Sequence, residues 1–167
     1  MSFSLLPAAL ANNITELPVS YFEEHGIKLL MLDFDNTIVP YTTNVPTQPV
    51  LDWLEQMIHS SVKLCVVSNS HKERVKIFCA NYGIDCITHA KKPFSKGICA
   101  CMERYGMKSA DCALVGDQIF TDVLGANSCG VKSILVDAIN NHNFWLKARH
   151  VLELPFIYAA KKRRIGS

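Results

Sequence analysis

Two aspartates, one residue apart, stand at the end of an apolar stretch. Asp33 and Asp35 follow the segment IKLLML, and Thr37 lies two positions further on. Carboxylates this close repel one another unless a cation neutralises them, and a cluster of oxygen ligands favours Mg²⁺. With the charge offset, Asp33 could attack phosphorus while Asp35 protonates the leaving oxygen and later activates water. The pair therefore predicts metal-assisted phosphoryl transfer.

Further polar residues follow this pair in order along the chain. Ser68 and Asn69 end the second apolar run, and Lys92 follows the third run. Asp117 ends the fourth run, and Asp122 lies five residues later. Hydroxyls, backbone N–H groups and the Lys92 ammonium would stabilise charge on phosphoryl oxygens. Taken singly, such residues commonly form turns, helix caps or solvated surface. Their combination is what indicates a site.

Five apolar runs of strand length must position these residues. The runs are continuous rather than alternating, as in strands buried on both faces, and segments of helical spacing separate them. This alternation predicts a Rossmann-like three-layer α/β/α sandwich with a central parallel sheet of about five strands. Ligands of such sheets bind beyond the carboxyl ends of the strands, where the polar residues would converge. The expected strands are residues 27–34, 62–68, 84–89, 111–117 and 131–137, and the expected helices are residues 47–60, 71–83, 93–106 and 121–130.

Length and composition bound the class of protein. The 167 residues favour one domain over residues 1–167, with the first 25 or so and residues 138–167 as peripheral segments. An apolar content of 49% with 19% charged residues excludes a disordered chain, and a net charge of +2 gives no reason to expect nucleic acid as a partner. The seven cysteines form no C-x-x-C pair, and the N-terminus lacks a basic signal region, so a reducing, cytoplasmic location is expected.

Competing phosphate and metal motifs do not fit. An EF-hand loop beginning at Asp33 would need glycine at its sixth position and glutamate at its twelfth, where Ile38 and Asn44 stand. Neither a P-loop nor a G-x-G-x-x-G fingerprint occurs, so nucleotide-binding forms of the Rossmann fold lose their main support.

Four segments resemble the motifs of haloacid dehalogenase (HAD) superfamily phosphatases. They are DFDNT at 33–37, VVSNS at 66–70, KKP at 91–93 and GDQIFTD at 116–122. The longer strings LDFDNTIVP, AKKPFSKG and VGDQIFTDVLGAN are similar to the YqeG branch of subfamily IIIA, which includes relatives of mitochondrial phosphatidylglycerophosphate phosphatase. The resemblance implies a HAD-like hydrolase domain and a Mg²⁺-dependent phosphatase that works through an aspartyl-phosphate.

The resemblance also assigns roles to the acidic residues. It implies that Asp33 is the nucleophile and a metal ligand. Asp35 becomes the general acid and base, and also binds the metal through its backbone carbonyl. Asp117 would be the third metal contact, and Asp122 an outer carboxylate that orients the catalytic lysine.

The remaining motif residues would hold the phosphoryl group. By the same resemblance, Thr37 supports the loop and, with Ser68 and Asn69, belongs to the phosphate site, while Lys92 steadies the nucleophile and the phosphoryl oxygens. Lys91 competes for the lysine role, but the proline that follows Lys92 favours Lys92.

Superfamily members often cover the site with a cap domain, and this chain has no room for one. The short spacings after the first and second motifs are filled by the expected helices and strands. An open site suits a bulky phosphorylated substrate, such as a lipid headgroup, and the resemblance makes phosphatidylglycerophosphate the expected substrate. Soluble small phosphate esters are the alternative.

Both ends of the chain place apolar residues beside basic ones. Residues 3–10 (FSLLPAAL) and 144–164 (FWLKARHVLELPFIYAAKKRR) combine them as interfacial segments do, which would allow peripheral contact with the inner face of a membrane. A terminal helix packed on the sheet is the competing interpretation. Pro155 is expected to interrupt or end a long helix there.

Two other functional classes remain as alternatives. A phosphoaspartate switch of the receiver type also uses an acidic cluster and a Lys-Pro pair, but its Lys-Pro follows the last strand, whereas Lys92 precedes two more strands here. Asp35 would also be superfluous in a switch, because a long-lived phosphoaspartate gains nothing from a general base. A non-catalytic HAD-like binding module is the third class.

Overall fold

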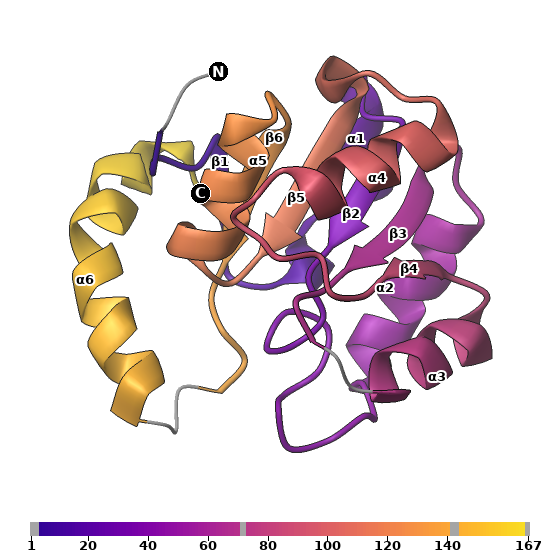
Figure 1. Cartoon of the computed structure of the whole chain (residues 1–167), viewed down its shortest axis with the longest axis horizontal. Coiled ribbons are helices and arrows are strands. Elements are labelled where there is room, and N and C mark those ends of the chain that lie inside the picture. Colours follow the sequence, from indigo (N-terminus) through magenta and orange to yellow (C-terminus); the bar gives the residue numbers. More distant parts are fainter. Residues whose placement is uncertain (1–3, 71–72, 141–143, 166–167) are drawn as a thin grey trace.

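A six-stranded sheet of parallel strands, in the order β1-β6-β5-β2-β3-β4, forms the centre of the protein (Figure 1). The computed structural model describes residues 4–70, 73–140 and 144–165, with the backbone alone for 144–150. The predicted parallel α/β architecture is confirmed, with one strand more than the five expected. The strands are β1 (Ala9–Ala11), β2 (Leu29–Leu32), β3 (Lys63–Val67), β4 (Asp85–Ile87), β5 (Cys112–Gly116) and β6 (Lys132–Val136).

Helices cover both faces of the sheet. Side chains along the strands alternate between two apolar clusters. Buried residues of α1 (Val19–Glu24), α2 (Gln48–Ile58) and α3 (Glu73–Tyr82) pack in one cluster, and those of α4 (Lys96–Tyr105) and α5 (Leu124–Ser128) pack in the other (Figure 1). The result is the three-layer sandwich that the continuous apolar runs predicted.

Local sequence signals explain how two of these helices are placed. The buried residues of α2 recur at helical spacing, and one of them, Trp53, donates a hydrogen bond from Nε1 to the backbone oxygen of Leu17 at 2.7 Å. Helix α4 ends at Tyr105, and the Gly106 that follows has a φ of 62° in the left-handed region and donates its N–H to the backbone oxygens of Glu103 and Met102. Helix α4 therefore stops just before the segment that leads into β5.

The sequence pattern does not predict strand β1. The segment Ala9–Ala11 pairs in parallel with β6 at the edge of the sheet, although the first residues of the chain were expected to be peripheral. It has only three residues, two of them alanine, which is depleted in strands, so no strand-like pattern stands out. The N-terminal segment thus extends the sheet by one strand.

Helix α6 (Phe144–Ala160) continues through Pro155, so the expected interruption is wrong. Proline removes one hydrogen bond, to the carbonyl of Val151, and both residues lie on the exposed side, where water can satisfy that carbonyl. The opposite side, with Ile157 and Ala160, packs on the β1–β6 edge. Within the described residues, no helix is long and apolar enough to span a bilayer.

Candidate active site

The end of β2 places the first aspartate at the middle of the sheet. The backbone N–H of Asp33 donates to the oxygen of Val115 in β5 at 2.9 Å, which continues the ladder by one residue. The chain then turns after Asp35, because Asn36 has a φ of 63° and its N–H donates to Val39 at 2.7 Å. Asparagine tolerates this left-handed conformation better than most residues. The turn keeps both aspartates at the carboxyl edge of the sheet.

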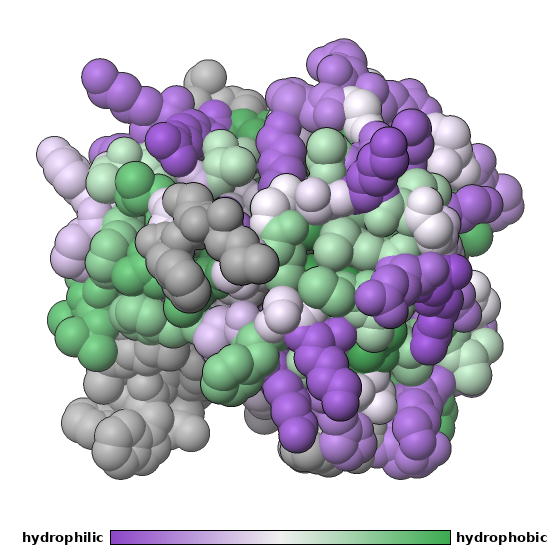
Figure 2. Space-filling view, turned by 45° about the horizontal axis from the view of Figure 1, so that its top comes forward, coloured by the Kyte–Doolittle hydropathy of each residue, from purple (hydrophilic) through white to green (hydrophobic). Residues whose placement is uncertain are grey.

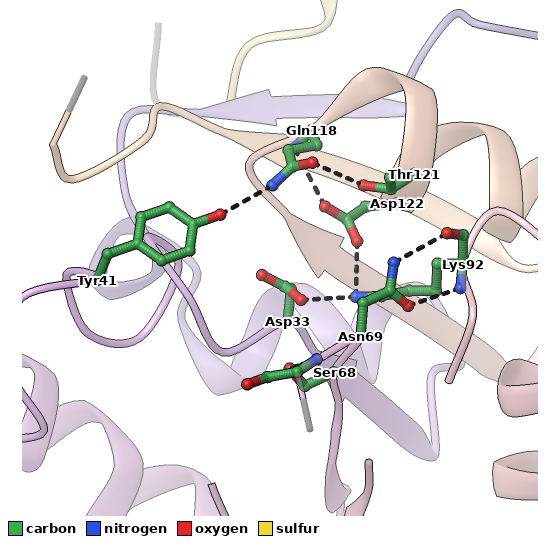
Figure 3. Close-up of polar contacts among 9 residues, drawn as sticks. Asp33, Tyr41, Ser68, Asn69, Lys92, Gln118, Thr121 and Asp122 are labelled. Carbon is green, nitrogen blue, oxygen red and sulfur yellow. Dashed lines mark hydrogen bonds and ion pairs between the residues drawn. The ribbon is translucent and has the colours of Figure 1, made fainter. Parts of the chain in front are cut away.

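Lys92 joins two of the predicted acidic residues. Its Nζ lies 2.7 Å from Oδ1 of Asp33 and 2.7 Å from Oδ1 of Asp122, and only 1% of its side chain is exposed (Figure 3). Lys91, the alternative considered from the sequence, is exposed. A buried ammonium needs counter-charges, and the two carboxylates provide them.

Burial and charge act in opposite directions on these groups. Burial disfavours the charged form of Lys92, but the carboxylates of Asp122 and Asp33 outweigh it, so the pKa of Lys92 is raised and the ammonium stays charged. Burial raises the pKa of Asp33 to about 7, against the lowering effect of the Lys92 charge and with a further rise from Asp122. Without a bound cation, Asp33 therefore exchanges its proton near neutral pH.

Asn69 holds the backbone of the lysine loop. Its Oδ1 accepts a hydrogen bond from the N–H of Lys92 at 2.7 Å, and its Nδ2 donates to the Lys92 carbonyl at 2.9 Å (Figure 3). The sequence assigned Asn69 to the phosphate, whereas its side-chain amide is directed to Lys92. Ser68, which is buried, accepts from the N–H of Ser70 at 3.0 Å and lines the candidate pocket, and its role in phosphate binding stays a prediction.

Asp122 is fixed from two sides. One oxygen pairs with Lys92, and the other, Oδ2, accepts a hydrogen bond from the N–H of Gln118 at 3.1 Å. Asp122 belongs to a π-helical turn, Ile119–Val123, that precedes α5 where the sequence predicted one helix from residue 121. Asp122 therefore contacts the lysine that it is expected to orient, and the orienting role itself stays a prediction.

An acidic cluster of the kind that holds a divalent cation lies at the same edge. Carboxylate oxygens of Asp33, Asp117 and Asp122, all buried, lie within 4.8 Å of one another. Since both oxygens of Asp122 are engaged, Asp33 and Asp117 are the better side-chain ligands. The carboxylate of Asp35 pairs with Arg74 instead, so its expected metal contact, through the backbone carbonyl, stays a prediction.

A pocket of about 180 Å³ opens beside this cluster. Thr37, expected at the phosphate, does not line it: the residue is buried, and its hydroxyl finds no hydrogen-bond partner among the described residues. A larger hollow of about 480 Å³ beside Pro93 and Cys129 contains no charged residue, so the smaller pocket is the candidate for the reaction. The smaller pocket is lined by Asp33, Asp35, Tyr41, Ser68, Asn69, Ser70, Lys92, Gln118 and Thr121.

Several residues near the site were missed from the sequence. Gln118 links Tyr41 and Thr121 across the pocket mouth, with hydrogen bonds of 3.4 and 3.2 Å (Figure 3). Arg74 pairs with Asp35, and Glu153 of α6 accepts a hydrogen bond from Ile119 N at 2.9 Å. One signal was available: Glu153 is a single acidic residue in an otherwise apolar stretch of α6, where burial with a partner is expected.

Solved structures share this architecture. The chain aligns with the cobalt-bound deoxy-D-mannose-octulosonate 8-phosphate phosphatase from Haemophilus influenzae at a TM-score of 0.55 and 13% identity, covering 83% of this chain and 92% of that one. It aligns with a HAD superfamily (subfamily III A) hydrolase from Legionella pneumophila at a TM-score of 0.53 and 14% identity, covering 90% and 91%. At such identities the likeness shows the fold.

With its acidic cluster and buried lysine at the carboxyl edge of the sheet, the chain is a phosphatase of the HAD superfamily, as its family match and its sequence relative show. Residues 2–140 match the family described as mitochondrial PGP phosphatase, and the chain belongs to that family. It is also 31% identical over 159 residues to the probable phosphatase YqeG of Bacillus subtilis, covering 95% of this chain and 92% of YqeG. The predicted YqeG-like, HAD-superfamily resemblance is thereby confirmed.

Proposed function

We propose that this phosphatase is a Mg²⁺-dependent phosphomonoesterase that forms an aspartyl-phosphate on Asp33, with phosphatidylglycerophosphate as its substrate. The observation that carries the proposal is the position of Asp33, which lines the small pocket while Lys92 holds its Oδ1 at 2.7 Å. A carboxylate so held points one oxygen at a fixed place, as a nucleophile requires.

The residues at the pocket divide the reaction between them. A carboxylate oxygen of Asp33 bonds to phosphorus, the ester P–O bond breaks, and the departing alcohol oxygen takes a proton from Asp35. Asp35 then removes a proton from a water molecule, whose oxygen attacks phosphorus and releases Asp33 and inorganic phosphate. The Lys92 ammonium and the Ser68 hydroxyl stabilise charge on the phosphoryl oxygens. Mg²⁺, held by Asp33 and Asp117, would neutralise the approach of carboxylate to phosphate.

The nucleophile is tested by a matched pair of variants. Asp33→Asn should abolish phosphate release and acid-stable labelling of the protein by radiolabelled substrate. Asp52→Asn, in which an exposed aspartate of α2 is changed, should behave as the wild type. Unchanged phosphate release by Asp33→Asn would overturn the mechanism.

The open site supports a bulky substrate. Between the Asp33 loop and α2, and between β3 and β4, the described residues form loops and the single helix α3, without a cap domain. The pocket of about 180 Å³ has room for a phosphoryl group and little more, so the rest of a large substrate would remain outside it. A lipid phosphate, whose acyl chains stay in the bilayer, meets both conditions.

The outer side of α6 supports contact with a membrane surface. Val151, Leu152 and Tyr158 are 61%, 65% and 79% exposed, and the exposed Lys161 and Lys162 follow them. Figure 2 shows apolar residues gathered on the left side of the molecule, where α6 lies. Exposed apolar side chains beside lysines match the interface of an anionic bilayer.

Substrate and membrane contact are tested together. The wild type should hydrolyse phosphatidylglycerophosphate in mixed micelles or anionic vesicles better than soluble phosphate esters. Val151→Asp with Leu152→Asp should lower the vesicle activity and leave the soluble activity unchanged, whereas Ile58→Asp, on the exposed side of α2, should affect neither. Efficient cleavage of soluble esters without cleavage of the lipid would remove the lipid assignment.

A further inference from the structure

Arg74, in the first turn of α3, makes three contacts with the segment that follows β2. Its Nη2 donates to Oδ1 of Asp35, and its Nη1 donates to the backbone oxygen of Tyr41 at 2.9 Å. Its guanidinium carbon lies 5.1 Å from the centre of the Phe34 ring. One side chain thus connects α3 to the aspartate loop and to the segment that follows it.

The location of Arg74 is not explained by the stability of α3. A cation in the first turn of a helix is disfavoured by the helix dipole. The pair is also not a solvated surface contact, because the Arg74 and Asp35 side chains are only 12% and 14% exposed. An unfavourable charge at a shielded position indicates that its contacts matter more than the helix that carries it.

Helix α3 also holds the residue between the two aspartates. Phe34 is fully buried, and its ring packs edge-on against Phe78 at a centroid distance of 5.1 Å. Phe78 lies one helical turn after Arg74, so Phe34 contacts both residues along one side of α3. The backbone around Asp35 is therefore anchored by Phe34, and the Asp35 carboxylate is anchored by Arg74.

We propose that Arg74 is a positioning residue that holds Oδ1 of Asp35, so that a proton on Oδ2 is placed for transfer to the leaving oxygen. The inference rests on the proposed function, in which Asp35 is the general acid. Arginine suits this task because its planar fork directs two N–H groups at once, one to Asp35 and one to the Tyr41 carbonyl. Lysine would provide a point charge without that geometry.

The proposal predicts a dependence on the leaving group. An alkoxide is a poor leaving group and needs the proton from Asp35, whereas a nitrophenolate departs with little help. Misplacing Asp35 should therefore slow the departure of an alkyl alcohol far more than that of nitrophenolate, a step that kcat/KM reports. A residue that only binds phosphate, or only stabilises the fold, would affect both substrates equally.

The experiment compares kcat and KM of three variants on glycerol 3-phosphate or an alkyl phosphate and on p-nitrophenyl phosphate. Arg74→Ala should lower kcat/KM for the alkyl ester by about 10²-fold, since this ratio covers the steps up to departure of the alcohol and a small misplacement of a catalytic group has this effect. Its kcat/KM for p-nitrophenyl phosphate should fall only slightly, which also shows that the protein is folded. Arg74→Lys should recover part of the loss.

Lys76→Ala is the matched control, because Lys76 is exposed on the same helix and pairs with Glu73, three residues earlier, at 3.3 Å. It should behave as the wild type on both substrates. An equal loss of kcat/KM for both esters in Arg74→Ala would overturn the positioning role.

A double variant separates this inference from the proposed function. If Arg74 acts through Asp35, Arg74→Ala should add little to the loss already caused by Asp35→Asn on the alkyl ester. Additive losses would overturn the inference. If instead Asp35→Asn alone lowers kcat/KM equally for both esters, the general-acid assignment of the proposed function fails, whatever Arg74 does.

Discussion

Gly116 and Asp122 are in such close contact that no side chain fits between them. A β-carbon built on Gly116 would lie 2.3 Å from Cγ of Asp122, well inside van der Waals contact. Asp122 in turn pairs with Lys92, which pairs with Asp33. The glycine at the end of β5 therefore determines where the buried lysine finds its second carboxylate.

We expect Gly116→Ala to displace Asp122 and to lower both stability and activity. Forcing an extra carbon into a packed site costs about 1–3 kcal/mol. The displaced carboxylate should also loosen Lys92, so the fold-change in kcat should be larger than the fold-change in KM. Urea denaturation and steady-state kinetics measure the two effects. Wild-type stability together with wild-type kcat would contradict the contact.

Lys92→Met should destabilise the protein, because it leaves the carboxylates of Asp33 and Asp122 buried without their cation. Breaking a buried ion pair from one side costs about 3–5 kcal/mol. The loss should be largest above pH 7 and shrink on acidification, since the raised pKa of Asp33 means that its neutral form, which needs no counter-charge, is populated below about 7.

The neighbouring lysine provides the control for Lys92. Lys91 is exposed, so Lys91→Met should change the unfolding free energy by less than about 0.5 kcal/mol. Urea unfolding at pH 6 and pH 8 compares the two variants. If Lys91→Met were as damaging as Lys92→Met, the assignment of the buried lysine would be wrong.

The sequence predicted the fold wherever a long, continuous apolar run formed a strand. Strand β1 was missed because an edge strand of three residues carries too little pattern. The helix α6 was expected to break at Pro155, but a single lost hydrogen bond on an exposed side is tolerated. Short elements and helix interruptions depend on tertiary context, which local sequence does not contain.

The candidate site was predictable to the extent that strand ends converge. Asp33, Ser68 and Asp117 each follow a strand, so topology alone brings them together. Arg74 and Glu153 were not predicted, because their contacts depend on how α3 and α6 pack against the sheet. The direction of the Asn69 amide likewise depends on the path of the Lys92 loop.

Mg²⁺ should bind more tightly as the pH rises. Burial raises the pKa of Asp33 to about 7, and a protonated carboxyl does not bind a cation, so below that pH binding must release a proton. The association constant, measured by isothermal titration calorimetry, should rise up to about tenfold per pH unit between pH 5.5 and 7 and level off above 7.

Asp117→Asn is the comparison for the metal prediction. It should weaken Mg²⁺ binding at every pH while keeping the pH dependence, because Asp33 still carries the proton. An association constant that does not change between pH 6 and pH 8 would contradict Asp33 as a ligand.

Glu153 connects α6 to the π-helical turn that carries Asp122. It is 2% exposed, and its Oε1 accepts the hydrogen bond of Ile119 N, the first residue of the π-helical turn that carries Asp122. Glu153→Ala would leave that buried N–H unsatisfied, which costs about 1–3 kcal/mol. Glu153→Gln keeps an acceptor oxygen and should lose less.

The functional effect of the Glu153 variants follows from the same turn. If Glu153→Ala shifts the turn, Asp122 moves relative to Lys92, and kcat should fall along with stability. Glu55→Ala, which changes an exposed acidic residue of α2, should alter neither. Urea denaturation and phosphate release measure both quantities. A buried N–H without an acceptor costs stability. A Glu153→Ala protein as stable as Glu55→Ala would therefore show that the turn does not depend on α6.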